Sequence, residues 1–376
     1  MSRYNDYYLV NDEDVELDDS VDFRITCQKR MLKKVFQRFL IICFVALIIT
    51  FISVFIILPL TFMKTVTLQE DLIFTHWNLP ISRSYYEQYP FPGFKNHYIN
   101  VEDIDNHTNL TLGLWHILPF KLAESARNNA NYDYDEALLN SNYTVILYFH
   151  GTGEDRSQSH RKYQLFRMFS HVIAFDYRCY GDSSTGSLSE KNVVSDSIQI
   201  YNWVRKKTKA SIYVWGHSLG TAVATNTLSQ LENNGNASGL ILEAPFTNLK
   251  DEIYAHPYLK YLSWLPWFEA TIIQPLQYNL FLFNTDKHIQ KISCPIMFLH
   301  AKDDTVVPYY MSEKLYNITL SKDRQEIHSV LHLYDRFLRL DHYFIYQDPH
   351  TPFFIYEFMK LGVKGGEEFF EGSHQS

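Results

Sequence analysis

Residues 211–232 constrain the fold of this chain more than any other stretch of its sequence. A short β-branched and aromatic run precedes Gly216-His217-Ser218-Leu219-Gly220, and an Ala- and Leu-containing helical segment follows it. A strand, a Gly-x-Ser-x-Gly turn and a helix are typical of a nucleophile elbow, whose glycines permit strained angles and close strand–helix approach. The pentapeptide alone arises by chance in roughly one chain of this length in ten, so the prediction depends on the flanking elements. Ser218 is the candidate nucleophile.

Apolar runs on both sides of this turn predict the rest of the sheet. Continuous runs, as expected of strands buried on both faces, occupy 144–149 and 171–176. Further strands are expected at 239–243 and 296–300, and a last one at 329–334. Helical stretches separate the earlier runs, including Val193–Lys206. This alternation predicts an α/β domain with a mainly parallel sheet. Two further strands, at 97–101 and 111–116, are expected to form a hairpin that leads into it.

A serine nucleophile needs a histidine to accept its proton and an acid to orient that histidine. In a chain of this pattern the order is Ser, acid, His, with the acid after a downstream strand. The run at 296–300 is followed by Asp303 and Asp304, of which we favour Asp304. Five histidines come later: His328, His332, His342, His350 and His374. We choose His342 because it falls in the loop after the last strand, and His350 is the alternative.

Backbone N–H groups must also meet the oxyanion that forms during acyl transfer. One should come from the residue after the nucleophile, which is Leu219, and one from the loop after an earlier strand, which is Thr152. Gly151 and Gly153 give that loop room to turn inward. Since the backbone donates, a threonine side chain at the second position costs the mechanism little.

Residues Phe39–Leu60 form 22 consecutive positions without a charge. As a helix they would extend ~33 Å, enough to cross a bilayer. The run is too long and too far from the first residue for a cleaved signal peptide, so we expect a single transmembrane signal anchor. Six basic residues precede it, Arg24, Lys29, Arg30, Lys33, Lys34 and Arg38, and only Lys64 follows closely. This bias predicts a cytosolic segment 1–38, a span 39–60 and a luminal or extracellular domain 61–376.

Five N-glycosylation acceptor tripeptides lie after the apolar run and none before it. Their asparagines are Asn106, Asn109, Asn142, Asn236 and Asn317. Such tripeptides also occur by chance, so they serve as a second, independent indication of the same topology.

Charge and cysteine content exclude several function classes. The net charge is −8, but residues 1–22 hold eight acids against Arg3, so the remainder is nearly neutral. A nucleic-acid-binding domain would carry clustered basic residues, and we expect none of that activity. Cys27, Cys43, Cys179 and Cys294 form no Cys-x-x-Cys pair, which argues against a zinc site or a disulfide scaffold. We therefore expect no metal, no cofactor and no obligate protein partner, and a disordered acidic tail.

Residues 251–289 are long, poorly periodic and rich in aromatic residues. Their place between two strands predicts a helical cap over the carboxyl edge of the sheet. The aromatic residues could line an acyl-chain pocket, lie against a bilayer, where Trp and Tyr favour the interface, or pack between helix and sheet.

An ordered set of motifs extends these expectations. They are Gly113-Leu114-Trp115-His116-Ile117-Leu118-Pro119, Asp176-Tyr177-Arg178 with Gly181-Asp182-Ser183, Trp215-Gly216-His217-Ser218-Leu219-Gly220, Glu243-Ala244-Pro245-Phe246-Thr247-Asn248, Ile292-Ser293-Cys294-Pro295 and His300-Ala301-Lys302-Asp303-Asp304. Over roughly residues 33–358 the chain resembles the α/β-hydrolase-domain-containing protein 12 family, the lysophosphatidylserine lipases.

The resemblance implies an α/β-hydrolase fold and a single-pass serine hydrolase of the endoplasmic reticulum membrane, with its catalytic domain in the lumen. It implies cleavage of the acyl ester of lysophosphatidylserine, of other lysophospholipids and of monoacylglycerols. The family's catalytic residues fall on Ser218, Asp304 and His342, the last before the matching Tyr343-Phe344-Ile345-Tyr346. Two alternatives are another lipid or thioester esterase on the same triad and a non-catalytic adhesion or scaffold protein.

Overall fold

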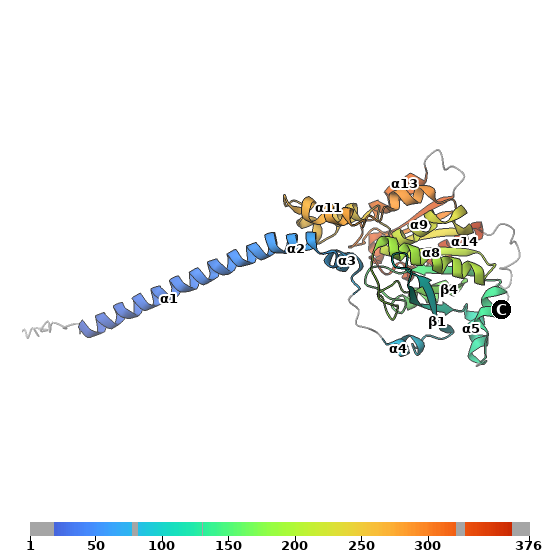
Figure 1. Ribbon diagram of the computed structural model, residues 1–376, viewed down its shortest axis with the longest axis horizontal. Helices are drawn as coiled ribbons and strands as arrows, with labels where there is room; N and C mark the ends of the chain where they lie inside the picture. Colours follow the sequence, from blue (N-terminus) through green and yellow to red (C-terminus); the bar gives the residue numbers. More distant parts are fainter. Residues whose placement is uncertain (1–18, 77–81, 130, 321–327, 363–376) are drawn as a thin grey trace, which may run out of the picture. The chain divides into compact units, whose positions relative to one another are not determined.

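The computed structural model describes residues 19–76, 82–129, 131–320 and 328–362, and these divide into two units at residues 61 and 62 (Figure 1). The acidic residues 1–18 and His374 lie outside the described residues, so the expectations made for them stay predictions.

The first unit is an apolar helix. It comprises α1 (Asp19–Ile52), a π-helical turn (Ser53–Ile57) and the start of α2 (Leu58–Lys64). The π turn ends at Ile57, two residues before Pro59, which has no N–H to donate to the preceding turn of helix. The Thr61 hydroxyl donates to the Ile57 carbonyl at 2.7 Å, which satisfies a group next to this irregularity. Residues Thr26–Lys64 are long and apolar enough to span a membrane, and the most apolar part is not buried.

The second unit is built on one eight-stranded sheet in the order β1-β2-β4-β3-β5-β6-β7-β8. The strands are β1 (Phe94–Glu102), β2 (Asn109–Ile117), β3 (Thr144–Phe149), β4 (Ser170–Phe175), β5 (Ile212–His217), β6 (Gly239–Glu243), β7 (Ile296–Ala301) and β8 (Ser329–Tyr334). β2 is antiparallel to both of its neighbours, and every pairing from β4 to β8 is parallel. The mainly parallel α/β architecture predicted from the apolar runs is confirmed, and the predicted hairpin is β1–β2.

Helices complete the second unit. They are α3 (Val66–Phe74), α4 (Arg83–Glu87), α5 (Phe120–Arg127), α6 (Tyr134–Leu139), α7 (His160–Phe166), α8 (Glu190–Lys207), α9 (Leu219–Gln230), α10 (Leu249–Ala255), α11 (Gln274–Tyr278), α12 (Thr285–His288), α13 (Tyr310–Thr319) and α14 (Thr351–Gly362). α9 packs against both α8 and β5. All residues of β4, β5, β6 and β7 are buried, as expected of parallel strands covered on both faces.

The segment predicted as a cap is broken into short pieces. Between β6 and β7 it contains α10, a 3₁₀ turn (Leu259–Tyr261), a π turn (Glu269–Ile273), α11 and α12. Three of its aromatic residues are buried, Phe268, Phe281 and Phe283, and packing accounts for them. Tyr254 and Trp267 are partly buried, and Tyr258, Tyr261, Trp264 and Tyr278 are exposed. The role of this segment as a cap stays a prediction.

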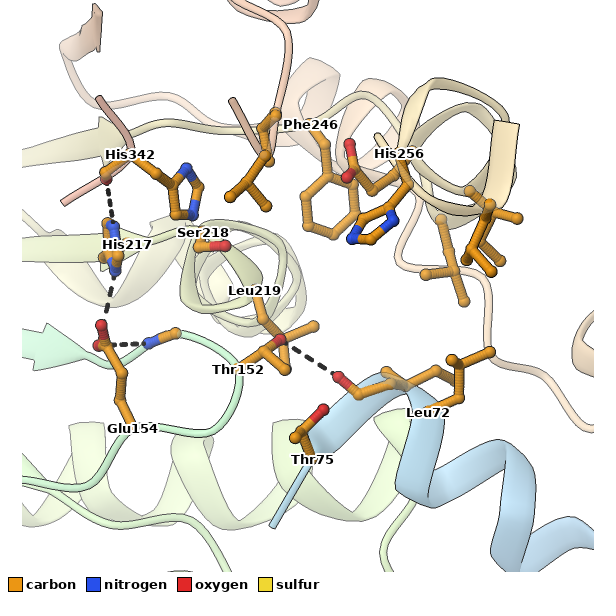
Figure 2. Close-up of a pocket in the computed structure, with 18 of the residues that line it drawn as sticks. Leu72, Thr75, Thr152, Glu154, His217, Ser218, Leu219, Phe246, His256 and His342 are labelled. Carbon is orange, nitrogen blue, oxygen red and sulfur yellow. Dashed lines mark hydrogen bonds and ion pairs between the residues drawn. The ribbon is translucent and has the colours of Figure 1, made fainter. Parts of the chain in front are cut away.

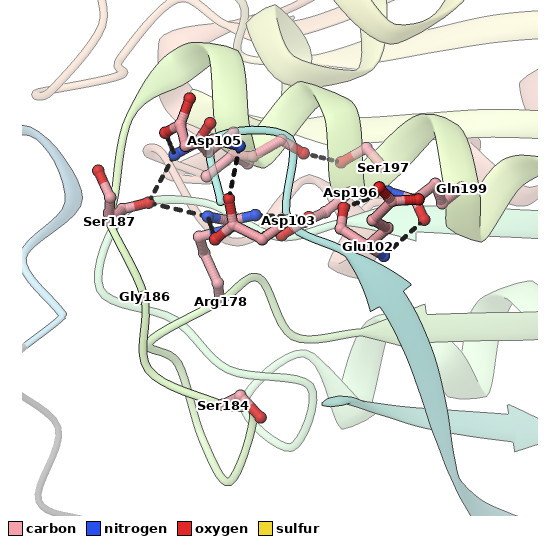
Figure 3. A network of polar contacts seen from close by, with 12 residues as sticks. Glu102, Asp103, Asp105, Arg178, Ser184, Gly186, Ser187, Asp196, Ser197 and Gln199 are labelled. Atoms are coloured by element: carbon pink, nitrogen blue, oxygen red, sulfur yellow. Dashed lines mark hydrogen bonds and ion pairs between the residues drawn. The ribbon is translucent and has the colours of Figure 1, made fainter. Parts of the chain in front are cut away.

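The Asp176-Tyr177-Arg178 motif has a structural part in this fold. Figure 3 shows Arg178 between Asp103, in the turn of the β1–β2 hairpin, and Asp196 on α8. Its guanidinium lies 3.0 Å from the Asp103 carboxylate and 2.7 Å from that of Asp196, and all three side chains are buried. Buried charges require such pairing, so Arg178 joins the hairpin, the loop after β4 and α8.

Candidate active site

Ser218 sits at the sharp turn between β5 and α9. Its backbone angles are φ 52° and ψ −121°, so the strain of the turn falls on the serine itself. The flanking glycines allow close approach instead. A Cβ on Gly220 would lie 2.2 Å from the Phe149 carbonyl oxygen, and one on Gly216 would lie 2.5 Å from the Gly220 carbonyl oxygen. Any larger residue at either position would push the helix away from the strand.

Asp304 and His342 are brought together across 38 residues of sequence. The His342 Nδ1 lies 2.7 Å from the Asp304 Oδ2, so Nδ1–H donates and Nε2 is left as the acceptor. The other carboxylate oxygen accepts the backbone N–H groups of Val306 and Val307, each at 2.8 Å. Burial alone would raise the pKa of Asp304, but hydrogen bonds from His300 and His342 lower it below its ordinary value. The carboxylate is therefore ionised and held in one orientation.

His342 is buried, and burial lowers the pKa of its imidazole although Asp304 partly opposes the shift. A neutral imidazole with a free Nε2 is the form that accepts a proton. Figure 2 shows the His342 ring turned toward Ser218, and both residues line one cavity. Among the described residues, the Ser218 hydroxyl makes no hydrogen bond to the His342 ring. In structures without substrate such catalytic hydrogen bonds are often long, and they shorten when substrate binds.

His300 is a residue that the sequence reasoning missed. Its Nε2–H is shared between the Asp304 Oδ2 at 3.1 Å and the Val307 carbonyl at 2.9 Å, and its Nδ1 accepts the Ser312 hydroxyl at 2.6 Å. It therefore helps to hold the same carboxylate oxygen that His342 contacts. The sequence places His300 four residues before Asp304, and this spacing could have indicated the contact between them.

The alternative candidates take other places. Asp303 accepts the backbone N–H of Asp341 at 3.2 Å, next to His342 in the chain. His350 lies 3.2 Å from Asp348 with its side chain 74% exposed, and His332 stacks on Phe354 with ring centroids 4.0 Å apart. Neither histidine lines the cavity that holds Ser218.

The expected oxyanion donors also border the cavity. Leu219 is the first residue of α9, so its N–H has no acceptor within the helix. Thr152 lies in the loop after β3, where its neighbours are occupied: the Gly151 N–H donates to Glu154 at 3.1 Å and the Gly153 N–H to the Phe74 carbonyl at 3.1 Å. The Thr152 N–H has no such acceptor among the described residues. Its role in oxyanion binding stays a prediction.

His217 connects the loop after β3, which contains Thr152, to the loop after β8, which contains His342 (Figure 2). Its imidazole is fully buried, and Nε2–H donates to the His342 carbonyl oxygen at 3.0 Å. Its Nδ1 lies 3.5 Å from the Glu154 carboxylate, which also holds Gly151. Burial opposes a charge on His217, but the Glu154 and Glu243 carboxylates raise its pKa above the ordinary value. The first variable residue of the pentapeptide therefore positions two loops, a role that the motif by itself did not indicate.

The cavity has a volume of about 550 Å³. Its apolar lining comes from α3, α9, α10, the segment between β6 and β7, and the loop after β7: Leu72, Ile73, Leu219, Phe246, Leu249, Ile253, Leu259, Val306 and Val307. Such a volume and lining suit a flexible apolar chain beside Ser218. The contribution of α3 was not expected from the sequence.

Comparison with known proteins places this geometry in context. A family profile described as "Serine aminopeptidase, S33" (Hydrolase_4) matches residues 140–280. The chain is 35% identical over 272 residues to "Lysophosphatidylserine lipase ABHD12" of Danio rerio, covering 70% of this chain and 69% of that one. It is also 35% identical over 241 residues to "Protein ABHD12B" of Homo sapiens, covering 62% of this chain and 64% of that one. Among solved structures, the acetyl xylan esterase from Paenibacillus sp. R4 aligns with a TM-score of 0.52 at 16% identity, covering 73% of this chain and 86% of that one, which shows a shared fold.

Proposed function

Because this chain belongs to the family of lysophosphatidylserine lipase ABHD12, we propose that it is a membrane-anchored enzyme cleaving the acyl esters of lysophospholipids, lysophosphatidylserine in preference, and of monoacylglycerols. The chain is a serine ester hydrolase with the α/β-hydrolase fold. The observation that carries the proposal is the 2.7 Å Asp304–His342 pair beside Ser218 in a largely apolar cavity.

The proposed mechanism is a two-step acyl transfer. The His342 Nε2 takes the Ser218 proton as the hydroxyl oxygen attacks the ester carbonyl, and Asp304 stabilises the imidazolium that results. The N–H groups of Leu219 and Thr152 hold the oxyanion. When this intermediate collapses, the ester bond breaks and His342 gives its proton to the leaving alkoxide, which departs as an alcohol.

The acyl-enzyme is then hydrolysed by the same groups. His342 removes a proton from water, the resulting hydroxide attacks the acyl carbonyl, and Ser218 leaves with the proton that His342 returns to it. The products are a fatty acid and the head-group alcohol. Since His342 carries each proton, this chemistry calls for no cofactor.

We also propose the membrane topology that the sequence predicts. Residues 1–38 lie in the cytosol, 39–60 cross the membrane of the endoplasmic reticulum, and 61–376 form the luminal hydrolase domain with a cap at about 251–289. Two features support it: the helix Thr26–Lys64 is apolar enough to span a bilayer, and all five acceptor asparagines are exposed. A tether of this kind keeps the enzyme beside single-chain lipids, which partition into the bilayer surface.

A fluorophosphonate probe and two lipid substrates test the proposal on the full-length protein in membranes. We expect labelling and hydrolysis of both lysophosphatidylserine and monooleoylglycerol, with Ser218→Ala abolishing all three and leaving the thermal unfolding midpoint unchanged. Asp304→Asn is expected to lower kcat about 10⁴-fold, because the imidazole would then take the wrong tautomer. Hydrolysis of neither lipid by a protein that the probe still labels would refute the proposed substrate class.

A further inference from the structure

One face of α10 forms part of the cavity wall. The residues concerned are Leu249, Glu252, Ile253 and His256, spaced three and four apart, which places them on a single stripe of the helix. Leu249 and Ile253 are aliphatic, as the apolar lining requires. Glu252 and His256 are polar, and Glu252 places a carboxyl where the pattern calls for an apolar side chain.

The Glu252 carboxyl is not used by the fold. Its Oε2 is buried and has no hydrogen-bond partner among the described residues. Its charged neighbours on the helix are partnered, since Asp251 accepts the Thr247 hydroxyl at 2.8 Å and Lys250 lies 2.8 Å from Glu269. Leaving a buried polar group unpaired costs free energy, so such a group calls for an explanation.

The charge balance of the cavity shows what this carboxyl could bind. Of the described residues that line the cavity, Glu154 and Glu252 are acidic and none is Lys or Arg. Glu154 is already held by Gly151 and His217. The His256 Nδ1 accepts the Tyr258 N–H at 3.4 Å, and burial lowers the pKa of this imidazole, so it brings no positive charge. His217 also lines the cavity with a raised pKa, but its imidazole already faces the Glu154 carboxylate at 3.5 Å. Near Glu252, the described wall therefore offers no lysine, arginine or charged histidine for an anionic group.

We propose that Glu252 is a head-group subsite that takes a hydrogen-bond donor of the substrate, either a terminal hydroxyl of a monoacylglycerol or the primary ammonium of a lysophospholipid. This inference rests on the proposed function, since it presupposes lipid ester cleavage at Ser218. Both donors are satisfied by the same unpartnered oxygen. Burial, and then the nearby Asp304, raise the pKa of Glu252 to about 9, so without a ligand the carboxyl is neutral at pH 7. An ammonium group would stabilise its ionised form.

The test compares Glu252→Leu and Glu252→Gln with the wild-type full-length protein. Leucine fits the apolar stripe and removes the subsite, whereas glutamine keeps the shape and an acceptor oxygen but cannot become charged. Glu124→Leu is a matched control, since Glu124 is an exposed acid on α5. The substrates are monooleoylglycerol, lysophosphatidylserine, lysophosphatidylcholine, whose quaternary nitrogen has no N–H, and p-nitrophenyl butyrate, which has no head group.

We expect Glu252→Leu to lower kcat/KM about tenfold, mostly through KM, on the substrate whose donor the subsite takes. If kcat/KM for monooleoylglycerol falls in Glu252→Leu but not in Glu252→Gln, the group that the subsite takes is the hydroxyl. If kcat/KM for lysophosphatidylserine falls in both variants while that for lysophosphatidylcholine is unchanged, the group that the subsite takes is the ammonium. Either conclusion also requires kcat/KM for p-nitrophenyl butyrate to change less than about twofold.

Two results would overturn the subsite: equal losses on all four substrates, or no loss on any of them. If the wild-type protein cleaves p-nitrophenyl butyrate in a Ser218-dependent manner but none of the lipids, the proposed function fails and the subsite fails with it. Thermal unfolding midpoints within a few degrees of the wild type separate these outcomes from misfolding.

Discussion

At the scale of single residues, the site contains two buried histidines whose pKa values are shifted in opposite directions. His342 is buried and its pKa is lowered, whereas the equally buried His217 has its pKa raised by the Glu154 and Glu243 carboxylates. Burial lowers the pKa of His342 most, and His217 and His300 lower it further, so Asp304 offsets the shift only in part. For His217 the two carboxylates outweigh burial. Two histidines in one site therefore differ in pKa because their surroundings differ, and the residue type alone does not determine the difference.

The lowered pKa of His342 predicts the acid side of the pH–rate profile. The base works only when it is neutral, so activity is lost as the pH falls through its pKa, which lies below the ordinary value of about 6.5. We expect kcat/KM for p-nitrophenyl butyrate to remain near its plateau at pH 6.5 and to fall below that pH. An acid limb centred at pH 7 or higher would contradict the neutral, desolvated base.

His217 is expected to act as a positioning residue. His217→Leu removes the hydrogen bond to the His342 carbonyl oxygen and the contact with Glu154, so kcat should fall about tenfold or more while KM changes little. His217→Gln can place an amide N–H near the position of Nε2 and should recover most of kcat. Equal loss in the two variants, measured by steady-state kinetics, would show that the hydrogen bond to His342 is not what matters.

At the scale of elements, the junction of β5 and α9 depends on the absence of side chains. Gly220→Ala would place a Cβ 2.2 Å from the Phe149 carbonyl oxygen and 2.6 Å from that of His150, both backbone atoms that cannot move aside. We expect a loss of about 3 kcal/mol or more in the free energy of unfolding, together with loss of probe labelling. Urea denaturation measures the first effect.

Gly186→Ala is the matched control for this junction. The nearest atom to its new Cβ would be the end of the Leu110 side chain at 3.3 Å, which can shift. This variant should change stability by less than about 1 kcal/mol. Similar stability of the two variants would contradict the close approach of α9 to β3.

At the scale of the whole molecule, the proposed topology predicts glycosylation. The acceptor asparagines Asn106, Asn109, Asn142, Asn236 and Asn317 are all exposed, so a luminal domain should carry glycans on at least some of them. Expressed in eukaryotic cells, the protein should increase its gel mobility after glycosidase treatment, and replacing the five asparagines by glutamine should give the same mobility directly. A protein that glycosidase leaves unchanged would contradict the luminal assignment.

Local sequence predicted the strands of the sheet, the nucleophile elbow and the candidate catalytic residues. The apolar run 144–149 specified β3 to the residue, because a strand buried on both faces must be largely apolar. The elbow was recognisable because its strained turn and close helix packing tolerate few residue types. The order along the chain left two aspartates and five histidines as candidates. The position of His342 after the last strand and the family resemblance favoured Asp304 and His342, which lie 2.7 Å apart.

Tertiary structure alone decided what surrounds these groups. The hydrogen bond from His217 to the His342 carbonyl joins residues 125 positions apart, and Leu72 and Ile73 on α3 meet Ser218 across the cavity. Glu252 lies in an ordinary helical sequence, and only the packing of α10 against the cavity leaves its carboxyl unpaired. Local propensity acts over a few residues, whereas a pKa or a substrate preference depends on which distant groups share a low-dielectric space. The sequence therefore determined the chemistry, and the packing decided the environment in which it operates.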